Sequence, residues 1–302
     1  RRIFLYRPQI PWRWVAGLQP WRTSELMCAI VRPLNRRERT YDLCGNPIIL
    51  CEGDCALTNT GWRTWAGAWL LARHMERHLA GVSEPRRLLD LSCGTGLAGI
   101  ALACAGHEVV LSDLDINVPT IRANLARNLP GAVRDDSTLE AMGNRWVNAQ
   151  ANCSDLSNVA SCVEKATQGA TGGSAASVSV LGYAWGRSLP EEMRRPFDIV
   201  LCGDLLYHVW NGRLHDQFYA TLCYLNRHVQ GKAGTEFLFG FQVRSGRQEE
   251  QVLETAARRL GLIQEELTVE SGDLGDPIIR DGKYRMVRLR PPTGDEEQAS
   301  TS

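Results

Sequence analysis

The run from Leu88 to Gly99, LLDLSCGTGLAG, constrains the fold more than any other part of the sequence. An apolar strand leads into an acid, Asp90, then into a loop of small residues, and then into an apolar helix start. Nineteen residues after Gly94, a second apolar strand ends in Asp113. Glycines in such a loop let the backbone approach a ligand, and an acid at the second strand end accepts hydrogen bonds from ribose hydroxyls. The run therefore predicts a nucleoside site at the carboxyl edge of a parallel sheet.

Strand-like and helix-like segments alternate from residue 86 onward. Strands are expected near 87–91, 108–112, 178–183, 197–203, 235–242 and 284–290, and helices near 97–105, 117–128, 212–228 and 246–260. An earlier helix is expected after Gly61, where apolar residues from Trp65 to Leu79 recur at helical spacing. This alternation predicts a doubly wound, mostly parallel α/β sheet with helices on both faces. Functional loops then lie at the carboxyl ends of the strands.

The segment before this alternation is typical of a hairpin over 40–52, with two apolar runs flanking a Gly45-Asn46 turn. A stretch rich in Gly, Ala, Ser, Asn and Thr at 131–177 interrupts the alternation and predicts a flexible surface insertion. The expected organisation is an N-terminal extension with the hairpin at 1–56, one domain at 57–291 and a disordered tail at 292–302.

Composition limits the possible partners and location of the protein. The 34 basic and 34 acidic residues cancel, so no overall charge favours nucleic acid or an anionic membrane. No run approaches the 18 apolar residues of a membrane span. Ten cysteines are scattered without a CxxC pair, which predicts reduced, mostly buried thiols and no metal site. We expect a monomeric cytoplasmic protein, with the nucleus as a second location, and no membrane or nucleic-acid partner.

Three interpretations compete for the loop at 92–99: a dinucleotide site, a site for S-adenosylmethionine (SAM), or a glycine turn without a ligand. The loop fits GxGxxG literally, but Asp90 beside it would repel a diphosphate, whereas the amino and sulfonium groups of SAM are cationic. Trp185 follows the third strand, where an indole can stack on adenine. The fourth strand ends before Asp204 and Tyr207, which puts a carboxylate and a phenol where a transferred methyl group would sit. These features favour SAM over a dinucleotide.

Together these motifs resemble the seven-strand, SAM-dependent protein-lysine methyltransferases, in particular the small eukaryotic enzymes that act on elongation factors, chaperones and AAA ATPases. The resemblance covers roughly residues 40–290 without the insertion. It implies a Rossmann-like SAM methyltransferase fold with a seven-strand sheet. The matching segments are Gly61…Trp65-Ala66-Gly67, Leu88–Gly99, the strand end at Asp113, Thr120–Asn128, Tyr183-Ala184-Trp185-Gly186, Asp204-x-x-Tyr207 and Gln242-Val243-Arg244.

The resemblance also implies a role for individual residues. Asp113 would hold the ribose, Trp185 would cover the adenine, and Trp65 would form the wall near the methionine end of the cofactor. Asp204 and Tyr207 would face the incoming amine as the catalytic residues. The full cofactor-binding set implied is Trp65, Asp90, Ser92, Cys93, Gly94, Gly96, Asp113, Leu114, Trp185 and Gly203.

Two positions depart from the family pattern. Ser92 stands where the family usually has glycine, so we expect this residue to avoid a positive φ. Ala184 stands where many members carry an aspartate, so a contact to the adenine amino group is missing unless the backbone replaces it.

The function expected from these features is SAM-dependent methyl transfer to a lysine side chain of a partner protein. Asp204 would orient the amine, and alignment of nitrogen, methyl and sulfur would supply most of the acceleration. The hairpin and the loop at 204–210 would reach the substrate. The alternatives are another acceptor (a protein amino terminus, histidine, arginine or a small amine), a binding module without turnover, and an NAD(P)-dependent oxidoreductase.

Overall fold

The computed structural model describes residues 37–53, 59–130, 177–226, 234–276, 278–279 and 281–293, and all structural statements concern these residues. The first 36 residues, nearly all of the predicted insertion and the end of the predicted tail lie outside them. The domain boundaries therefore stay predictions.

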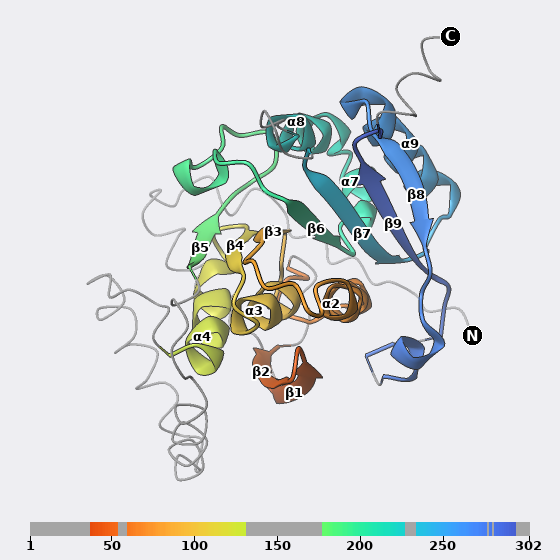
Figure 1. Ribbon diagram of the computed structural model, residues 1–302. Helices are drawn as coiled ribbons and strands as arrows, with labels where there is room; N and C mark the ends of the chain where they lie inside the picture. Colours follow the sequence, from red (N-terminus) through yellow and green to blue (C-terminus); the bar gives the residue numbers. More distant parts are fainter. Residues whose placement is uncertain are drawn as a thin grey trace, which may run out of the picture.

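A seven-stranded, mostly parallel sheet forms the centre of the molecule, in the order β5-β4-β3-β6-β7-β9-β8 (Figure 1). Only β9 runs antiparallel to its neighbours, which are β7 and β8. This confirms the predicted doubly wound α/β fold. The strands are β3 Arg87–Leu91, β4 Glu108–Asp113, β5 Val178–Gly182, β6 Ile199–Gly203, β7 Glu236–Gln242, β8 Ile263–Leu267 and β9 Tyr284–Arg290.

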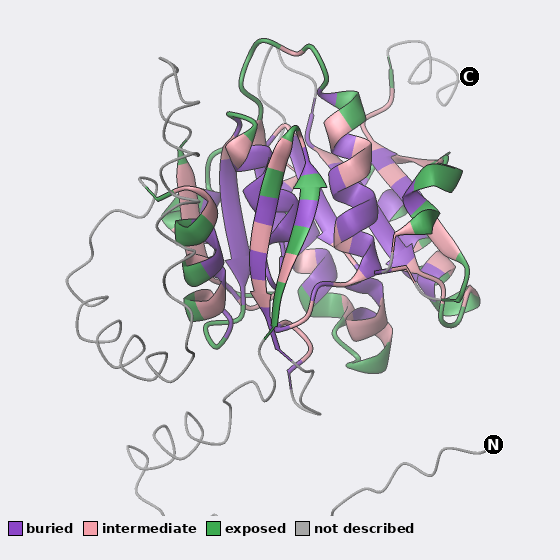
Figure 2. Cartoon of the chain, turned by 90° about the horizontal axis from the view of Figure 1, so that it is seen from below, coloured by how far each residue is buried: buried purple, intermediate pink, exposed green. Residues whose placement is uncertain are grey.

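Helices cover both faces of this sheet, with α2, α3 and α4 on one face and α7, α8 and α9 on the other (Figure 1). Strand residues alternate between the two helix layers: Leu88 belongs to the core under α2 and α3, and Leu89 to the core under α7–α9. The central strands are accordingly buried along most of their length (Figure 2). The helices are α2 Ala66–His78, α3 Leu97–Cys104, α4 Val118–Asn128, α7 Leu206–Asn211, α8 His215–Leu225 and α9 Arg247–Leu260; short 3-10 turns are η2 Glu191–Met193 and η3 Ser271–Gly275.

Two predicted elements differ from the structure. The expected helix at 212–228 is the shorter α8, and the helix α7 before it was not predicted; Arg213 between the two helices has a positive φ of 55°. Strand β8 was not predicted, because its sequence IQEEL has three polar or charged residues between its two apolar ends. It forms at the edge of the sheet, where ion pairs from the neighbouring β9 fix it, such as Arg285 with Glu266 and Arg288 with Glu265.

The N-terminal hairpin is confirmed, as β1 Arg37–Leu43 and β2 Asn46–Glu52, but its turn lies one residue earlier than predicted. Cys44 and Gly45 are the two turn residues, with φ of 53° and 72°. A two-residue turn with both φ values positive matches the twist of a hairpin, which explains why this register wins. The side-chain amide of Asn46 donates to the carbonyl of Cys44 and closes the turn at 2.9 Å.

Two asparagines of α4 attach this hairpin to the domain. Asn128 bonds both the N–H and the carbonyl of Ile49, and Asn124 does the same for Cys51. The side-chain amides thus take the place of a third strand along the free edge of β2. Since the hairpin turn contacts Glu76 near the end of α2, its tip lies about 14 Å of helix away from the start of α2.

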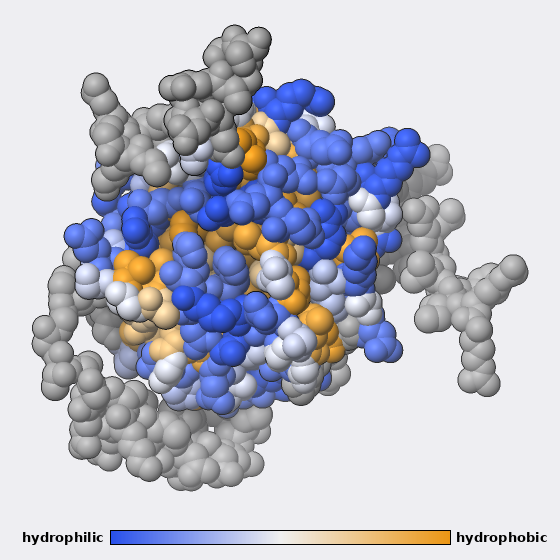
Figure 3. Space-filling view, turned by 45° about the vertical axis from the view of Figure 1, so that its right-hand side comes forward, coloured by the Kyte–Doolittle hydropathy of each residue, from blue (hydrophilic) through white to orange (hydrophobic). Residues whose placement is uncertain are grey.

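None of the helices among the described residues is long and apolar enough to cross a membrane. Large hydrophobic side chains are exposed there at five scattered positions, and the face in Figure 3 shows hydrophobic residues mixed with hydrophilic ones. Among the six described cysteines, Cys93 and Cys202 are buried as predicted, whereas Cys223 is exposed. The exposed positions are Leu114, Ile116, Leu214, Tyr224 and Leu274.

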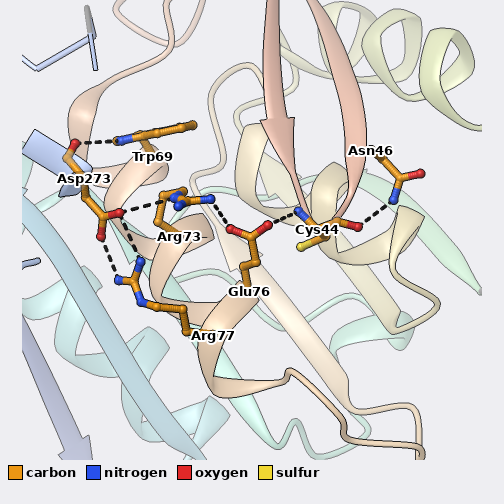
Figure 4. A network of polar contacts seen from close by, with 7 residues as sticks. All are labelled: Cys44, Asn46, Trp69, Arg73, Glu76, Arg77 and Asp273. Atoms are coloured by element: carbon orange, nitrogen blue, oxygen red, sulfur yellow. Dashed lines mark hydrogen bonds and ion pairs between the residues drawn. The ribbon is translucent and has the colours of Figure 1, made fainter. Parts of the chain in front are cut away.

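A buried carboxylate, Asp273 of η3, connects the C-terminal part of the sheet to α2 (Figure 4). Arg77 donates two hydrogen bonds to it, at 2.7 and 3.0 Å, and Arg73 donates a third. Arg73 also pairs with Glu76, which accepts from the backbone N–H of Cys44 in the hairpin turn. Burial by itself raises the pKa of Asp273, but the two arginines outweigh it and hold the pKa below its usual value.

Replacing Asp273 with asparagine is expected to lower the free energy of unfolding by about 1–3 kcal/mol at pH 7, because two arginines lose their charged partner. A carboxyl whose pKa is lowered by folding stabilises the folded chain above its unfolded pKa of about 3.9, and that contribution is lost as the pH falls through the folded value. Chemical denaturation at several pH values should show a difference that shrinks below about pH 4. D281N, at an exposed position, is the control, and a deficit in D273N that does not change with pH would contradict this account.

Candidate functional site

The candidate site lies at the carboxyl edge of the sheet, where the strand order reverses between β3 and β6. Hydrogen bonds join the loops that follow the strands there. Gly94 after β3 donates to Asp113 at the end of β4, at 2.7 Å. Trp185 after β5 donates its indole N–H to the hydroxyl of Ser92, at 3.1 Å. The structure therefore brings predicted residues of three separate segments together at one edge.

The loop after β3 turns by three residues with positive φ: Ser92 at 59°, Gly94 at 60° and Gly96 at 88°. The expectation that Ser92 avoids a positive φ is wrong. The left-handed conformation costs a non-glycine residue roughly 1–2 kcal/mol, and the hydrogen bond from Trp185 holds the serine there. Cys93 between them is buried, and burial raises the pKa of its thiol well above the usual value, so this thiol is not a nucleophile.

Asp90 at the end of β3 is only 3% exposed and accepts a hydrogen bond from the backbone N–H of Gly99 in the first turn of α3, at 2.9 Å. Burial raises its pKa to about 7. The carboxyl group is therefore directed to the start of a helix and is only partly ionised at neutral pH. This arrangement does not support the sequence argument that Asp90 would repel a diphosphate.

Asp113 is held by three donors at the end of β4. Its Oδ2 accepts from Gly94 N, and its Oδ1 accepts from Leu114 N and from the side-chain amide of Asn117, each at 2.7 Å. Burial raises the pKa of Asp113, and these hydrogen bonds oppose the rise. A carboxylate has about four acceptor positions, so one remains on Oδ2. The side chain is fixed in place and can still accept one hydrogen bond from a ligand.

Segment 59–65 is linked to the Asp113 carboxylate through Asn117, which is hydrogen-bonded to both. Asn59 donates its side-chain amide to the Oδ1 of Asn117 at 2.7 Å, and its own Oδ1 accepts from Gly61 N. A Cβ at Gly61 would lie 2.2 Å from the amide nitrogen of Asn117, so this close approach requires glycine. Further along the segment, Thr60 bonds the imidazole of His208 at 3.2 Å.

Two apolar side chains next to Asp113 are open to solvent. Leu114 is 53% exposed and Ile116 is 44% exposed. Trp185, on the neighbouring loop, packs its ring on Phe218 with centroids 5.2 Å apart. This edge therefore has accessible apolar surface and an indole close to the loop after β3, which are suitable for a flat base.

Asp204, directly after β6, ties three chain segments together. Its Oδ2 accepts from Gly67 N in the first turn of α2, at 2.6 Å. Its Oδ1 accepts from Gln242 N at 3.1 Å and from the guanidinium of Arg244 at 3.2 Å. The residue has a positive φ of 52° and its side chain is 5% exposed. The three hydrogen bonds leave one acceptor position on this carboxylate as well.

Glycines allow the start of α2 to pack closely against the ends of β6 and β7. A Cβ at Gly67 would lie 2.1 Å from the carbonyl oxygen of Gly240 and 2.8 Å from the carboxylate of Asp204. A Cβ at Gly203 would lie 3.1 Å from the backbone nitrogen of Ala68. Gly203 was expected as part of the cofactor-binding set, and the structure gives another reason for a glycine there: the start of α2 packs against this strand end.

An aromatic cluster surrounds the Arg244 guanidinium. Its Cζ lies 5.1 Å from the ring centroid of Tyr207 and 5.7 Å from that of Trp65. Arg63 lies 5.4 Å from the Trp65 ring, and Trp210 meets Tyr207 edge-on at 5.1 Å. Trp65, Asp204 and Tyr207 therefore lie around one cation, although the first and last of them are 142 residues apart in the sequence.

Sequence reasoning missed several residues of this edge, above all Asn117, Asn59 and Gly67. Gly67 was part of the Trp-Ala-Gly motif, so its signal was present without a structural reason. Asn59 and Asn117 belong to no local motif, because they are hydrogen-bonded to each other across 58 residues of sequence. Within the described part of the chain, no group of three or more His, Cys, Asp or Glu could hold a metal ion.

Residues 52–149 match the model of a protein family described as lysine methyltransferase. Over 90 residues the chain is 24% identical to EEF1A lysine methyltransferase 3 of Mus musculus, a match that covers 30% of this chain and 38% of the mouse protein. The similarity therefore spans less than half the length of that curated relative. It confirms the resemblance to this family over the region that contains the Asp113 half of the site.

Among solved structures, the chain is similar to the 16S rRNA N2 G1207 methyltransferase of T. thermophilus, which was determined in complex with AdoMet and guanosine. The TM-score is 0.50 at 16% sequence identity, and the alignment covers 86% of this chain and 52% of that chain. At this identity the likeness concerns the fold alone. The fold is that of the SAM-dependent methyltransferases.

Replacing Asn117 with alanine is expected to release segment 59–65 from Asp113, because the amide that joins them is lost. Unfolding should cost about 1–3 kcal/mol less, and amide exchange over 59–65 should become faster. Hydrogen-exchange mass spectrometry measures this. N226A is the matched control, since Asn226 donates a comparable amide hydrogen bond to Leu260 on the other side of the sheet. Equal exchange over 59–65 in both variants would contradict the connection.

Proposed function

We propose that this protein transfers a methyl group from SAM to a lysine side chain of a partner protein. The observation that carries the proposal is the placement of Asp113 at the end of β4, and of Asp204 and Tyr207 after β6, at the carboxyl edge of a SAM methyltransferase fold, with β3 between the two strands. The match to the lysine methyltransferase family and the mouse relative support lysine as the acceptor. The family match lies at residues 52–149, which contain Asp113 but not Asp204 or Tyr207.

The adenosyl half of the cofactor would lie over the loops after β3, β4 and β5. Asp113 has one acceptor position left for a ribose hydroxyl, and Leu114 offers exposed apolar surface beside it. Trp185 would cover the adenine. The backbone of Ser92, Cys93, Gly94 and Gly96 would lie under the methionine end, which fits a loop whose turns are made by positive φ values. Asp90 would contribute indirectly, because its carboxyl group accepts a hydrogen bond from Gly99 and so holds the start of α3.

The acceptor would approach between Trp65, Tyr207 and Asp204. A lysine side chain has a pKa near 10.4, so freeing its lone pair at pH 7 costs roughly 4–5 kcal/mol. Burial of the amine and the neighbouring sulfonium both reduce this cost. Asp204 would orient the amine with its remaining acceptor position, and Tyr207 would form one wall. The remaining acceleration would come from in-line alignment of nitrogen, methyl and sulfur.

The hairpin has a smaller part in this proposal than the sequence suggested. Its turn contacts Glu76 near the end of α2, whereas Gly67 at the start of α2 contacts Asp204. The tip therefore lies at the end of α2 that is far from the acceptor. A partner protein would meet the site through residues 204–210, most of which belong to α7, and through segment 59–65.

The proposal is tested by incubating the full chain with [methyl-3H]SAM and a eukaryotic cell extract, and by locating the label with mass spectrometry. Label on a lysine supports the proposal. Label on an arginine, a histidine, an amino terminus or a small amine keeps methyl transfer and replaces the acceptor. Calorimetry that shows tight NADH binding and no SAM binding would overturn the proposal and favour an oxidoreductase.

Replacing Asp113 with alanine should weaken SAM binding by roughly 1–3 kcal/mol, because a charge-assisted hydrogen bond to the ribose is lost. Isothermal titration calorimetry measures the change. D42A is the control, because Asp42 is an exposed carboxylate of the hairpin. If D113A binds SAM as tightly as D42A does, Asp113 does not hold the ribose. Circular dichroism of both variants confirms that the comparison is between folded proteins.

A further inference from the structure

We propose that Arg244 is a positioning residue that keeps the acceptor amine neutral by offsetting the charge of Asp204. This inference rests on the proposed methyl transfer and adds to it a residue that acts through Asp204 and not on the methyl group. It concerns the charge balance at the acceptor end of the site, which neither the motifs nor the similar proteins address.

The geometry places the guanidinium of Arg244 directly on the carboxylate. The Nη1 of Arg244 lies 3.2 Å from the Oδ1 of Asp204, whose side chain is 5% exposed, while that of Arg244 is 25% exposed. Tyr207 and Trp65 flank the same guanidinium, with ring centroids 5.1 and 5.7 Å from Cζ. A cation on two aromatic faces and one buried carboxylate is held by three attractive contacts.

The backbone around Arg244 is fixed independently of its side chain. Glu249, which is 1% exposed, accepts hydrogen bonds from the backbone N–H groups of Arg244 and Ser245. Gln242 N donates to Asp204, and Val243 N donates to the carbonyl of Lys283. The guanidinium therefore starts from a fixed backbone, which keeps its charge at one place relative to Asp204.

The positive charge of Arg244 matters for the protonation state of the acceptor amine. Before transfer, a lysine ammonium must lose a proton to solvent. The neutral nitrogen then forms a bond to the methyl carbon as the carbon–sulfur bond breaks, and the positive charge of the sulfonium passes to the nitrogen. An uncompensated carboxylate would stabilise the full charge of the ammonium more than the partial charge of the transition state, and so would slow the reaction. With Arg244 on it, Asp204 can orient the amine without holding its proton.

His208 lies in the same cluster and reports this charge without any substrate. Thr60 bonds its imidazole, Tyr207 meets it edge-on, and the charged groups acting on it are Arg244, Asp113 and Asp204. Arg63 lies over the Trp65 ring, which also flanks Arg244. Burial lowers the pKa of His208 first, and Arg244 lowers it further, while the two carboxylates oppose both effects.

The first test is an NMR titration of the His208 ring in the full chain, with the resonance assigned by its loss in H208Q. In R244M the pKa of His208 should rise by roughly 0.5–1 unit, because a neighbouring cation is lost and Asp204 is left uncompensated. R244Q is a second neutral variant in case R244M does not fold. R247M removes an exposed arginine three residues away and should leave the pKa unchanged. An unchanged pKa in both neutral variants, or an equal rise in R247M, overturns the proposal.

The second test is the pH dependence of methyl transfer from [methyl-3H]SAM to a pool of peptides that each contain one lysine. The deficit of R244M should be about tenfold near pH 7 and should shrink as the pH approaches 10, where the free amine is neutral. R244K should restore most of the rate. A deficit of constant size at every pH would show a purely structural role and overturn the proposal. If the parent protein labels no peptide but labels another acceptor, the proposed function fails, while the His208 titration still decides whether Arg244 sets the charge.

Discussion

The close approach of α2 to the ends of β6 and β7 is the constraint on which the rest of the site depends. Gly67 and Gly203 permit it, since a Cβ at either position would meet backbone atoms of the opposite segment. Asp204 then locks it, because its carboxylate accepts hydrogen bonds from α2 and from the end of β7. Trp65 is the residue that precedes α2, so this junction also decides where the indole lies. Without it, the aromatic cluster around Arg244 would have no fixed wall.

A second set of hydrogen bonds holds segment 59–65, which ends at Trp65 immediately before α2. Asn117 links Asn59 to Asp113, and the hydroxyls of Thr64 and Thr95 lie 2.7 Å apart, within hydrogen-bond distance. Segment 59–65 is thus fixed both to the strand end that would hold the ribose and to the helix that follows Asp204. One stretch of chain forms a wall for both halves of the proposed site. In the proposed site, such an arrangement would couple the cofactor half to the acceptor half, because a change in the position of this segment would alter both.

The sequence predicted what local patterns encode and missed what depends on distant partners. Apolar runs that end in Asp90 and Asp113 gave the central strands, and β9 was predicted to the residue. The positive φ of Ser92 could not be inferred, because the hydrogen bond that holds it comes from Trp185, 93 residues away. Strand β8 carries no apolar alternation and exists because β9 pairs with it. The interactions of Asp204 span 137 and 40 residues, and no pattern within a window of sequence encodes them.

Asp113 and Asp204 solve one physical problem in two ways. A buried carboxylate loses hydration, so it stays ionised only if hydrogen bonds or a cation replace the water. Asp113 is hydrogen-bonded by three N–H donors, and its remaining acceptor position would suit a neutral ribose hydroxyl. Asp204 shares its charge with Arg244, which suits a group that must give up a proton before it reacts. In the proposed site, the same residue type at two strand ends would therefore serve a ribose hydroxyl at one position and a neutral nucleophile at the other, and Arg244 marks the difference between the two carboxylates.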